Sequence, residues 1–207
     1  MKESNSEQLE ESNTIIKEKV KLNREWSFWE NYLKKNSSAY LLEEIYSFDD
    51  IISFWQFWNK YPGNDTKKIF YNGEYLTYFF KEKCRINGMN LFVKGIKPEW
   101  EDVNNKGGKI FILEYEVKND LEIFLSLVND TWIKLICNLI GEQMPYTNKI
   151  NGIRFVDKTK LGKGIIFKFE VWVNSLMKEQ TEFDELKSYL SKNYGCSGIM
   201  IKDIQVI

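Results

Sequence analysis

The spacing of apolar residues switches repeatedly between a period of two and a period near 3.6 along this chain. Apolar runs with strand character are predicted at residues 22–29, 69–71, 75–80, 91–93, 110–115, 152–158, 164–173 and 199–204. Helical spacing is predicted at about 51–60, 120–140 and 181–194. Hairpin strands interspersed with helices, without a β-α-β rhythm, predict an α+β fold in which helices cover one face of an antiparallel sheet.

Residues that favour helix ends flank all three helical segments. They are, in chain order, Asp49 or Asp50, Asn119 or Asp120, Gly141, the capping box Thr181-x-x-Asp184, and Gly195. The dipeptide Asn72-Gly73 lies between two aromatic, β-prone runs and predicts a tight hairpin.

The composition limits the chemistry that this chain can perform. Its 207 residues suffice for one domain, and we expect a flexible N-terminal tail over residues 1–20 before a single domain over 21–207. There is no histidine, the usual general base and zinc ligand. Cys84, Cys137 and Cys196 are too widely spaced to suggest a disulfide framework or a zinc cluster. We therefore expect no metal, no cofactor, no signal peptide and no membrane span.

Charge and aromatic content bear on possible ligands. The net charge of −1 excludes a global basic field, so any contact with nucleic acid should be local. Aromatic residues make up 15% of the chain, which fits either a large aromatic core or rings that stack on bases.

The segment GIKPEWEDVNNKGGK, residues 95–109, places an indole, a carboxylate and a basic, glycine-rich turn in one loop. The face of Trp100 can attract a flat, delocalised cation. The carboxylate of Glu101 can accept two parallel N–H donors from a guanine edge. A nearby lysine can meet phosphate as a point charge. The loop therefore contains what is needed to hold a positively charged base with a phosphate tail.

This segment and several others, in the same order, resemble the translation initiation factor 4E family, which binds the 7-methylguanosine cap of messenger RNA. The matching motifs are Trp26-x-x-Trp29, Ser47-Phe48-Asp49, Phe54-Trp55, the Trp100 loop, Trp132 with Leu139-Ile140-Gly141-Glu142, and Gly152. The resemblance implies a curved antiparallel sheet backed by three helices on its convex face, with the cap cleft on the concave side. It also implies a protein that is not an enzyme.

The resemblance implies roles for individual residues at the base of the cap. Trp100 is expected to be one of two rings that sandwich the methylated base, and Glu101 is expected to bind the guanine edge. The family usually has a second tryptophan in the loop after the first strand. This chain has none there, so Tyr40 is the best candidate and Tyr46 the alternative.

Basic residues are expected on the triphosphate. Lys109, Lys158 and Lys163 fall where the family has its phosphate contacts, and Arg154 and Lys160 are additional charges nearby. Lysine keeps the charge of the arginine common at the first two positions but lacks its planar fork. Phe167 matches a family tryptophan near the cap, and a core position for it is equally compatible with the pattern.

A second surface is implied on the convex face, where the family holds a helix of the scaffold factor 4G or of 4E-binding proteins. The implied contacts are Trp55, Ile51, Ile133, Cys137 and Gly141. The alternative for Trp55 is a core position beside Trp58. Compared with the family, this chain also has an inserted segment at about residues 63–88, which contains the Asn72-Gly73 hairpin.

The sequence thus predicts a monomeric, non-catalytic cap-binding protein of the cytoplasm that links capped mRNA to a 4G-like scaffold, with the nucleus left open as a second location. The first alternative is a cap-binding repressor that does not engage the scaffold. Two others are an enzyme acting on caps or nucleotides and a module that uses its rings only for protein contacts. The missing histidines and phosphate-binding loop speak against an enzyme.

Overall fold

The computed structural model describes residues 20–34, 40–72, 74–75, 84–118, 120–159, 164–196 and 198–204. For residues 34, 40, 71–72, 74–75 and 84 it describes the backbone alone. The predicted tail at 1–20 lies outside these residues except for Val20.

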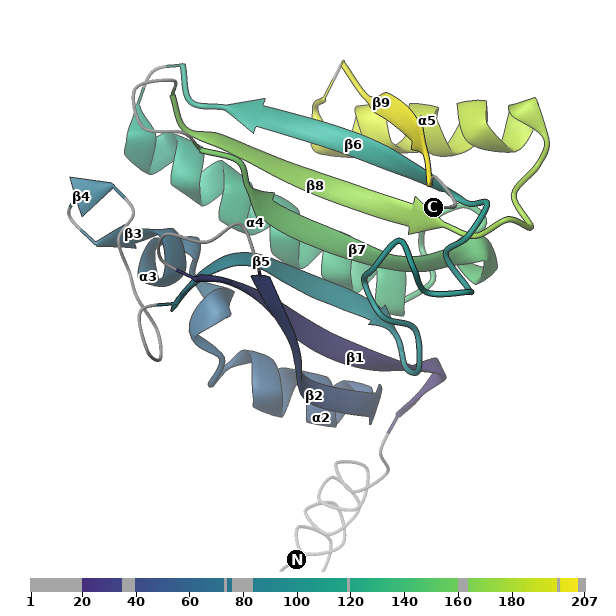
Figure 1. The fold of residues 1–207 in the computed structure, drawn as a ribbon, viewed down its shortest axis with the longest axis horizontal. Coiled ribbons are helices and arrows are strands. Elements are labelled where there is room, and N and C mark those ends of the chain that lie inside the picture. The colour runs from purple at the N-terminus through teal and green to yellow at the C-terminus, as the bar shows by residue number, and fades with distance from the viewer. Residues whose placement is uncertain are drawn as a thin grey trace, which may run out of the picture.

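A seven-stranded antiparallel sheet forms the centre of the molecule (Figure 1). Its strands in spatial order are β2 (Tyr40–Asp50), β1 (Lys21–Lys34), β5 (Cys84–Val93), β7 (Ile150–Asp157), β8 (Ile166–Val173), β6 (Lys109–Glu116) and β9 (Met200–Asp203). A separate small hairpin pairs β3 (Tyr71–Asn72) with β4 (Glu74–Tyr75), as the Asn72-Gly73 signal predicted. The predicted α+β class and curved antiparallel sheet are confirmed.

The helices cover one face of this sheet (Figure 1). They are α2 (Ile51–Trp58), α3 (Thr66–Phe70), α4 (Leu121–Ile140) and α5 (Gln180–Tyr194), with 3-10 turns η1 (Pro62–Asn64) and η2 (Thr147–Lys149). Among the described residues, α4 is the one helix long and apolar enough to cross a membrane by length and composition alone. Half of its apolar window is buried against the sheet, as a core helix requires.

Alternation along β6 shows how the two faces of the sheet differ. Phe111 and Leu113 point toward the helices and join the main core. Ile110 and Ile112 point the other way, where they pack with Trp172 and two further apolar residues in a smaller cluster. Because this apolar cluster is small, many other strand positions on the concave face are available for polar side chains.

The helix ends test the predicted caps. The Asp50 carboxylate accepts a hydrogen bond from the Ser53 N–H at 2.8 Å, and that of Asp120 accepts one from Ile123 at 3.0 Å, so both predicted caps are confirmed. The cap predicted at Thr181 is wrong. Glu179 caps α5, because the Glu182 side chain reaches back to the N–H of Glu179 and completes the capping box two residues earlier.

Two strand predictions were also wrong. Residues 40–50 form the edge strand β2, which is absent from the strands predicted above, because most of its side chains are partly exposed and give little apolar alternation. Ile69 and Phe70 lie in the short helix α3, with both side chains buried in the core. Two aromatic-flanked residues cannot distinguish a helical turn from a strand by periodicity.

Candidate functional site

A pocket of about 260 Å³ opens on the concave side of the sheet. It is lined by Asn31, Asn87, Gly88, Pro98, Glu99, Trp100, Glu101, Arg154, Val156, Lys158 and Glu170. The structure therefore brings three predicted site residues together, namely Trp100, Glu101 and Lys158. The Trp100 side chain is 49% exposed, so its ring is available to a ligand.

Two side chains hold the loop between β5 and β6 in one conformation. The Asp102 carboxylate accepts hydrogen bonds from the backbone N–H groups of Lys97 at 2.8 Å and Asn104 at 2.9 Å. Asn105 is fully buried and donates from Nδ2 to the carbonyls of Lys97 and Glu99, each at 2.8 Å. The loop is closed on itself by these bonds, which leave the tryptophan ring outside.

Asn105 also connects the loop to the sheet through a chain of amides. Asn151 on β7 donates from Nδ2 to the Asn105 Oδ1 at 2.9 Å and to the Asn104 carbonyl at 2.8 Å. Asn174, just after β8, donates to the Asn151 Oδ1 at 3.3 Å. Buried amides paired in this way fix the position of the backbone that they bind.

Replacing Asn105 with Ala should lower the free energy of unfolding by about 2–3 kcal/mol, because it removes the two hydrogen bonds to the Lys97 and Glu99 carbonyls and one of the two bonds made by the Asn151 amide. Urea unfolding followed by circular dichroism measures the change. Asn104→Ala is the matched control, since the Asn104 side chain is exposed and bonds only to Asp102. Equal stability of the two variants would contradict the role assigned to Asn105.

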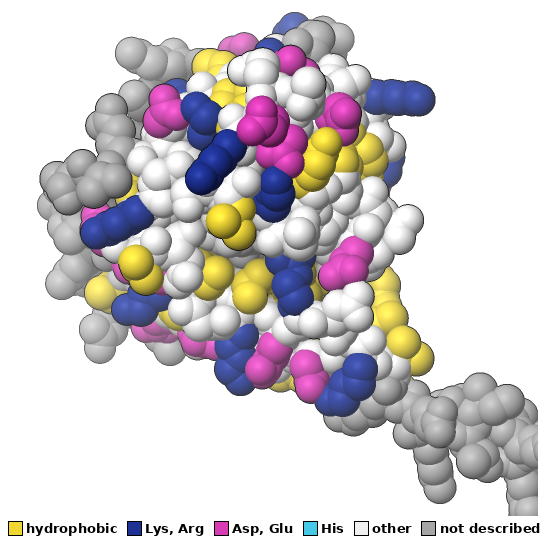
Figure 2. Space-filling view, turned by 90° about the vertical axis from the view of Figure 1, so that its right-hand side faces the viewer, with side chains coloured by type: hydrophobic (Ala, Val, Ile, Leu, Met, Phe, Trp, Pro, Cys, Tyr) yellow, Lys and Arg dark blue, Asp and Glu magenta, His cyan; other side chains and the backbone are white. Residues whose placement is uncertain are grey.

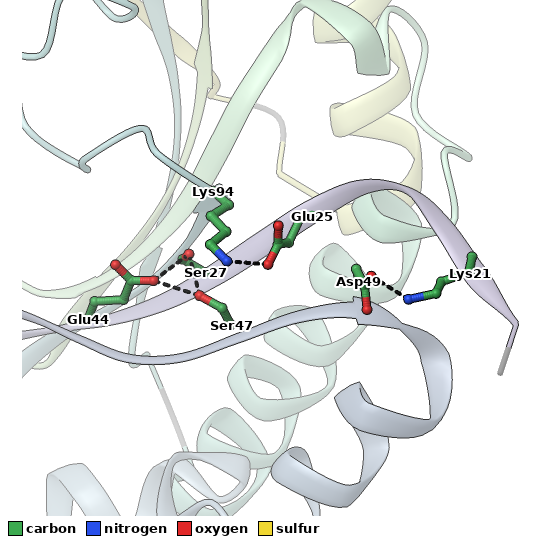
Figure 3. A network of polar contacts seen from close by, with 7 residues as sticks. All are labelled: Lys21, Glu25, Ser27, Glu44, Ser47, Asp49 and Lys94. Carbon is green, nitrogen blue, oxygen red and sulfur yellow. Dashed lines mark hydrogen bonds and ion pairs between the residues drawn. The ribbon is translucent and has the colours of Figure 1, made fainter.

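The start of the loop is anchored to β1 (Figure 3). Lys94 forms an ion pair with Glu25, and its backbone N–H donates to the Glu25 carbonyl at 2.9 Å. Beside this pair, the Ser27 hydroxyl contacts Glu44 at 2.7 Å and Ser47 at 2.8 Å, which connects β1 to β2. The Lys94 contacts fix the start of the loop against β1, in the part of that strand that pairs with the second half of β2.

The floor of the pocket is a polar row that crosses four strands. The Asn31 Oδ1 accepts from Asn90 at 2.7 Å, and the Asn90 Oδ1 accepts from the Arg154 Nε at 3.0 Å. The Arg154 Nη1 lies 3.4 Å from the Glu170 Oε2, which also accepts from the Trp172 indole N–H at 3.1 Å. The guanidinium of Arg154 is thus held in place beneath the pocket.

Lys158 has an electrostatic environment suited to an anion. Partial burial lowers the pKa of its ammonium; Glu170 opposes this, and the positive charges of Arg154 and Lys168 lower the pKa further. An anion bound beside Lys158 would relieve the repulsion among these cations. The wall of the pocket formed by β7 is therefore the side where a phosphate fits.

Comparison with known proteins agrees with this geometry. The sequence model described as "Eukaryotic initiation factor 4E" matches residues 21–195. This chain belongs to the eukaryotic initiation factor 4E family.

Named relatives are distant. Initiation factor 4E of Candida albicans is 28% identical over 137 residues, which are 64% of this chain and 56% of that protein. This chain thus matches little more than half the length of that relative. Ascaris suum eIF4E-3, solved with the m7G cap, has a TM-score of 0.64 at 23% identity, over 92% of this chain and 94% of that one. Caenorhabditis elegans eIF4E-3, solved with the 4E-binding protein Mextli, has a TM-score of 0.64 at 21% identity. The match covers 89% of this chain and 93% of that one.

Lys109, one of the phosphate contacts expected for a member of the 4E family, lies on the wrong face of the sheet. Residues two apart in a strand point to the same face, so Lys109 shares the face of Phe111 on β6, which points toward the helices. Its ammonium lies 2.5 Å from the Asp203 carboxylate and 5.3 Å from the centre of the Phe183 ring. We therefore correct the prediction and exclude Lys109 from the site.

Some of the other expected cap contacts lie outside the described residues, and others lie on the helix side of the sheet. Lys160 and Lys163 lie outside the described residues, and Tyr40 begins β2 with only its backbone described. The alternative ring, Tyr46, stacks on Phe57 of α2 at 4.5 Å between ring centres and so belongs to the helix side. Phe167 is fully buried in the main core, so of its two possible positions, near the cap or in the core, the core position is the observed one.

The expected partner surface of this 4E family member lies on the helix side. On α2, Trp55 is 40% exposed and Ile51 37% exposed, so Trp55 is not a core residue beside Trp58. On α4, Ile133 and Cys137 are one turn apart and half-buried. Gly141 ends α4, where an added Cβ would lie 2.9 Å from the Cys137 carbonyl oxygen.

The surface charge of the protein is mixed around the β5–β6 loop. Figure 1 shows that this loop lies at one end of the molecule, and Figure 2 shows basic and acidic side chains interspersed on that end. This end of the molecule therefore offers local charged contacts and not a broad basic field.

Several pocket residues were missed by sequence reasoning. Asn31, Asn87 and Glu170 were not singled out, and Arg154 was named only as an additional charge. One usable signal was the alternation of strand residues. Arg154 lies between the core residues Ile153 and Phe155 of β7 and must therefore point to the opposite face.

Proposed function

We propose that this protein binds the 7-methylguanosine cap of mRNA in the concave pocket and a helix of a 4G-like scaffold on the opposite, helical side. The observation that carries the cap assignment is the meeting of Trp100, Glu101 and Lys158 in one pocket. These side chains supply a ring face, a bidentate acceptor and a cation, which match the base face, the base edge and the phosphates of the cap.

Methylation at N7 makes guanine cationic, and this is the basis of selectivity. A cation over an electron-rich indole gains an electrostatic term that neutral guanine lacks. Stacking contributes about 1–3 kcal/mol per ring, and the charge-assisted bond to Glu101 adds about 2 kcal/mol. Together with phosphate contacts these terms are sufficient for micromolar binding. Tyr40 is proposed as the second ring and Lys163 as a further phosphate contact.

The known structures support both halves of this proposal. The Ascaris suum eIF4E-3 structure is a complex with the m7G cap, and the Caenorhabditis elegans eIF4E-3 structure is a complex with Mextli, a 4E-binding protein. The exposure of Trp55 favours a protein that engages a helical partner over a repressor that does not. We further propose a monomeric, non-enzymatic protein of the cytoplasm, with one domain from residue 21 that includes the inserted segment at about 63–88.

A titration of intrinsic tryptophan fluorescence tests the cap assignment. We expect 7-methyl-GTP to quench the emission of the full chain and to bind at least tenfold more tightly than GTP, because only the methylated base is a cation. Equal affinity for the two nucleotides would overturn the proposed function.

A further inference from the structure

Asn87 occupies a distinctive position in the pocket wall. The pairing of β1 with β5 shifts there: Asn31 lies opposite Gly88, whereas the next residue of β1, Tyr32, lies opposite Ile86. Asn87 is therefore the extra residue of a β-bulge, a device that redirects a side chain out of the regular alternation. Its side chain lines the same pocket as Trp100 and Glu101.

The Asn87 side chain has a hydrogen-bond acceptor without a donor in the described part of the chain. Its Oδ1 is buried and has no hydrogen-bond partner among the residues that the structure describes. A buried acceptor without a partner is costly, so one inside a ligand pocket is best explained by a donor that the ligand brings.

The strand register places Asn87 along the length of the pocket. Asn90 pairs with Arg154 at the floor, and Gly88 pairs with Val156 one step further out. Lys158 follows Val156 by two residues, just past the end of β7, and lines the same pocket. Asn87 thus lies beside the stretch that leads from the pocket floor to the proposed phosphate contact.

The donors of a cap nucleotide are few. They are the N1–H and amine of the base and the hydroxyls of the ribose. Under the proposed function, on which this inference rests, Glu101 takes the base donors. The ribose joins the base to the phosphate and lies between Glu101 and Lys158. We propose that the Asn87 Oδ1 accepts a hydrogen bond from a ribose hydroxyl of the cap nucleotide, which makes this pocket selective for an unmodified ribose.

A thermodynamic cycle between ligand and residue tests this. The affinities of the full chain and of Asn87→Ala are measured for 7-methyl-GTP and for its 2′-deoxy and 3′-deoxy forms. We expect one deoxy form to bind the wild-type chain about tenfold more weakly than 7-methyl-GTP, because Oδ1 then stays unpaired. In Asn87→Ala that ratio should fall to about one, since the acceptor is gone.

Two further variants separate contact from folding. Asn87→Asp keeps an acceptor and should keep the preference for the ribose hydroxyl, even if its charge weakens binding of every phosphate ligand. Asn104→Ala removes an exposed loop amide and should keep the wild-type ratio. Because each ratio is taken within one variant, a change in overall stability cancels.

The outcomes distinguish this inference from the function on which it rests. If the wild-type chain prefers 7-methyl-GTP to GTP but binds both deoxy forms as tightly as 7-methyl-GTP, the ribose contact is wrong and cap binding stands. If the tenfold ratio persists in Asn87→Ala, the contact belongs to another residue. If methylated and plain GTP bind equally, the proposed function itself fails.

Discussion

Replacing Trp100 with Ala should lower the affinity for 7-methyl-GTP about 100-fold. The ring is half exposed and lines the pocket, and its loop is held by its own hydrogen bonds, so truncation removes the stacking surface without unfolding the loop. A stacked base contributes about 1–3 kcal/mol and a desolvated cation–π contact about 2 kcal/mol, and a combined loss near 3 kcal/mol corresponds to about 100-fold. Isothermal calorimetry measures both affinities.

The size of the effect should depend on the methyl group. Trp100→Ala should bind plain GTP only a little more weakly than the wild-type chain, because neutral guanine gains less from the ring face. Trp100→Phe keeps a smaller ring, so its affinity for 7-methyl-GTP should lie between those of Trp100→Ala and the wild-type chain. A Trp100→Ala protein that retains wild-type preference for 7-methyl-GTP would show that the base stacks elsewhere.

Replacing Trp55 with Ala should weaken binding of an amphipathic helix from a 4G-like scaffold by about 100-fold. Trp55 packs edge-on against the buried Phe54 ring at 4.8 Å and remains 40% exposed, as an anchoring side chain of an interface does. Truncation of such an aromatic anchor typically costs about 2–4 kcal/mol. Fluorescence anisotropy with a labelled helix peptide measures the loss.

The two substitutions serve as controls for each other. Trp55→Ala should bind 7-methyl-GTP as the wild-type chain does, and Trp100→Ala should bind the helix peptide normally, because the two rings lie on opposite sides of the sheet. If Trp55→Ala bound the helix peptide with wild-type affinity, the partner surface would lie elsewhere on the protein.

Much of the fold could be predicted because local signals agreed with tertiary packing. The period of α4, its cap at Asp120 and its end at Gly141 all correspond to the observed helix. The hairpin of β7 and β8 also appeared in the sequence as two β-prone runs around a basic turn. In these segments the residue propensities, the spacing of apolar residues and the residues that end each element all indicate the same structure.

The errors fall where local signals are weak or are outweighed. The edge strand β2 is stabilised by pairing with β1, a contact between distant residues that periodicity does not report. The residues Ile69 and Phe70 are helical because α3 must bury them against the core. At α5, Thr181 and Glu179 both precede plausible first turns, and the Glu182 side chain decides between them.

The candidate site was predictable where a motif carries its own chemistry. The sequence singled out Trp100 and Glu101, which line the pocket, because an indole next to a carboxylate in a loop can hold a flat cation with N–H donors. Lys109 was misplaced because a charged residue at the start of a strand gives no sign of which face it takes, and the ion pair with Asp203 joins residues 94 positions apart. Asn87 could not be found because a bulge is visible only once the partner strand is known.

The amide chain from Asn105 through Asn151 to Asn174 has a kinetic consequence. Under the proposed function, the recognition loop is already assembled before a nucleotide arrives, so the encounter need not wait for a slow ordering step. Association can then approach the rate set by diffusion and orientation, and the lifetime of the complex is left to determine how tightly the nucleotide is held.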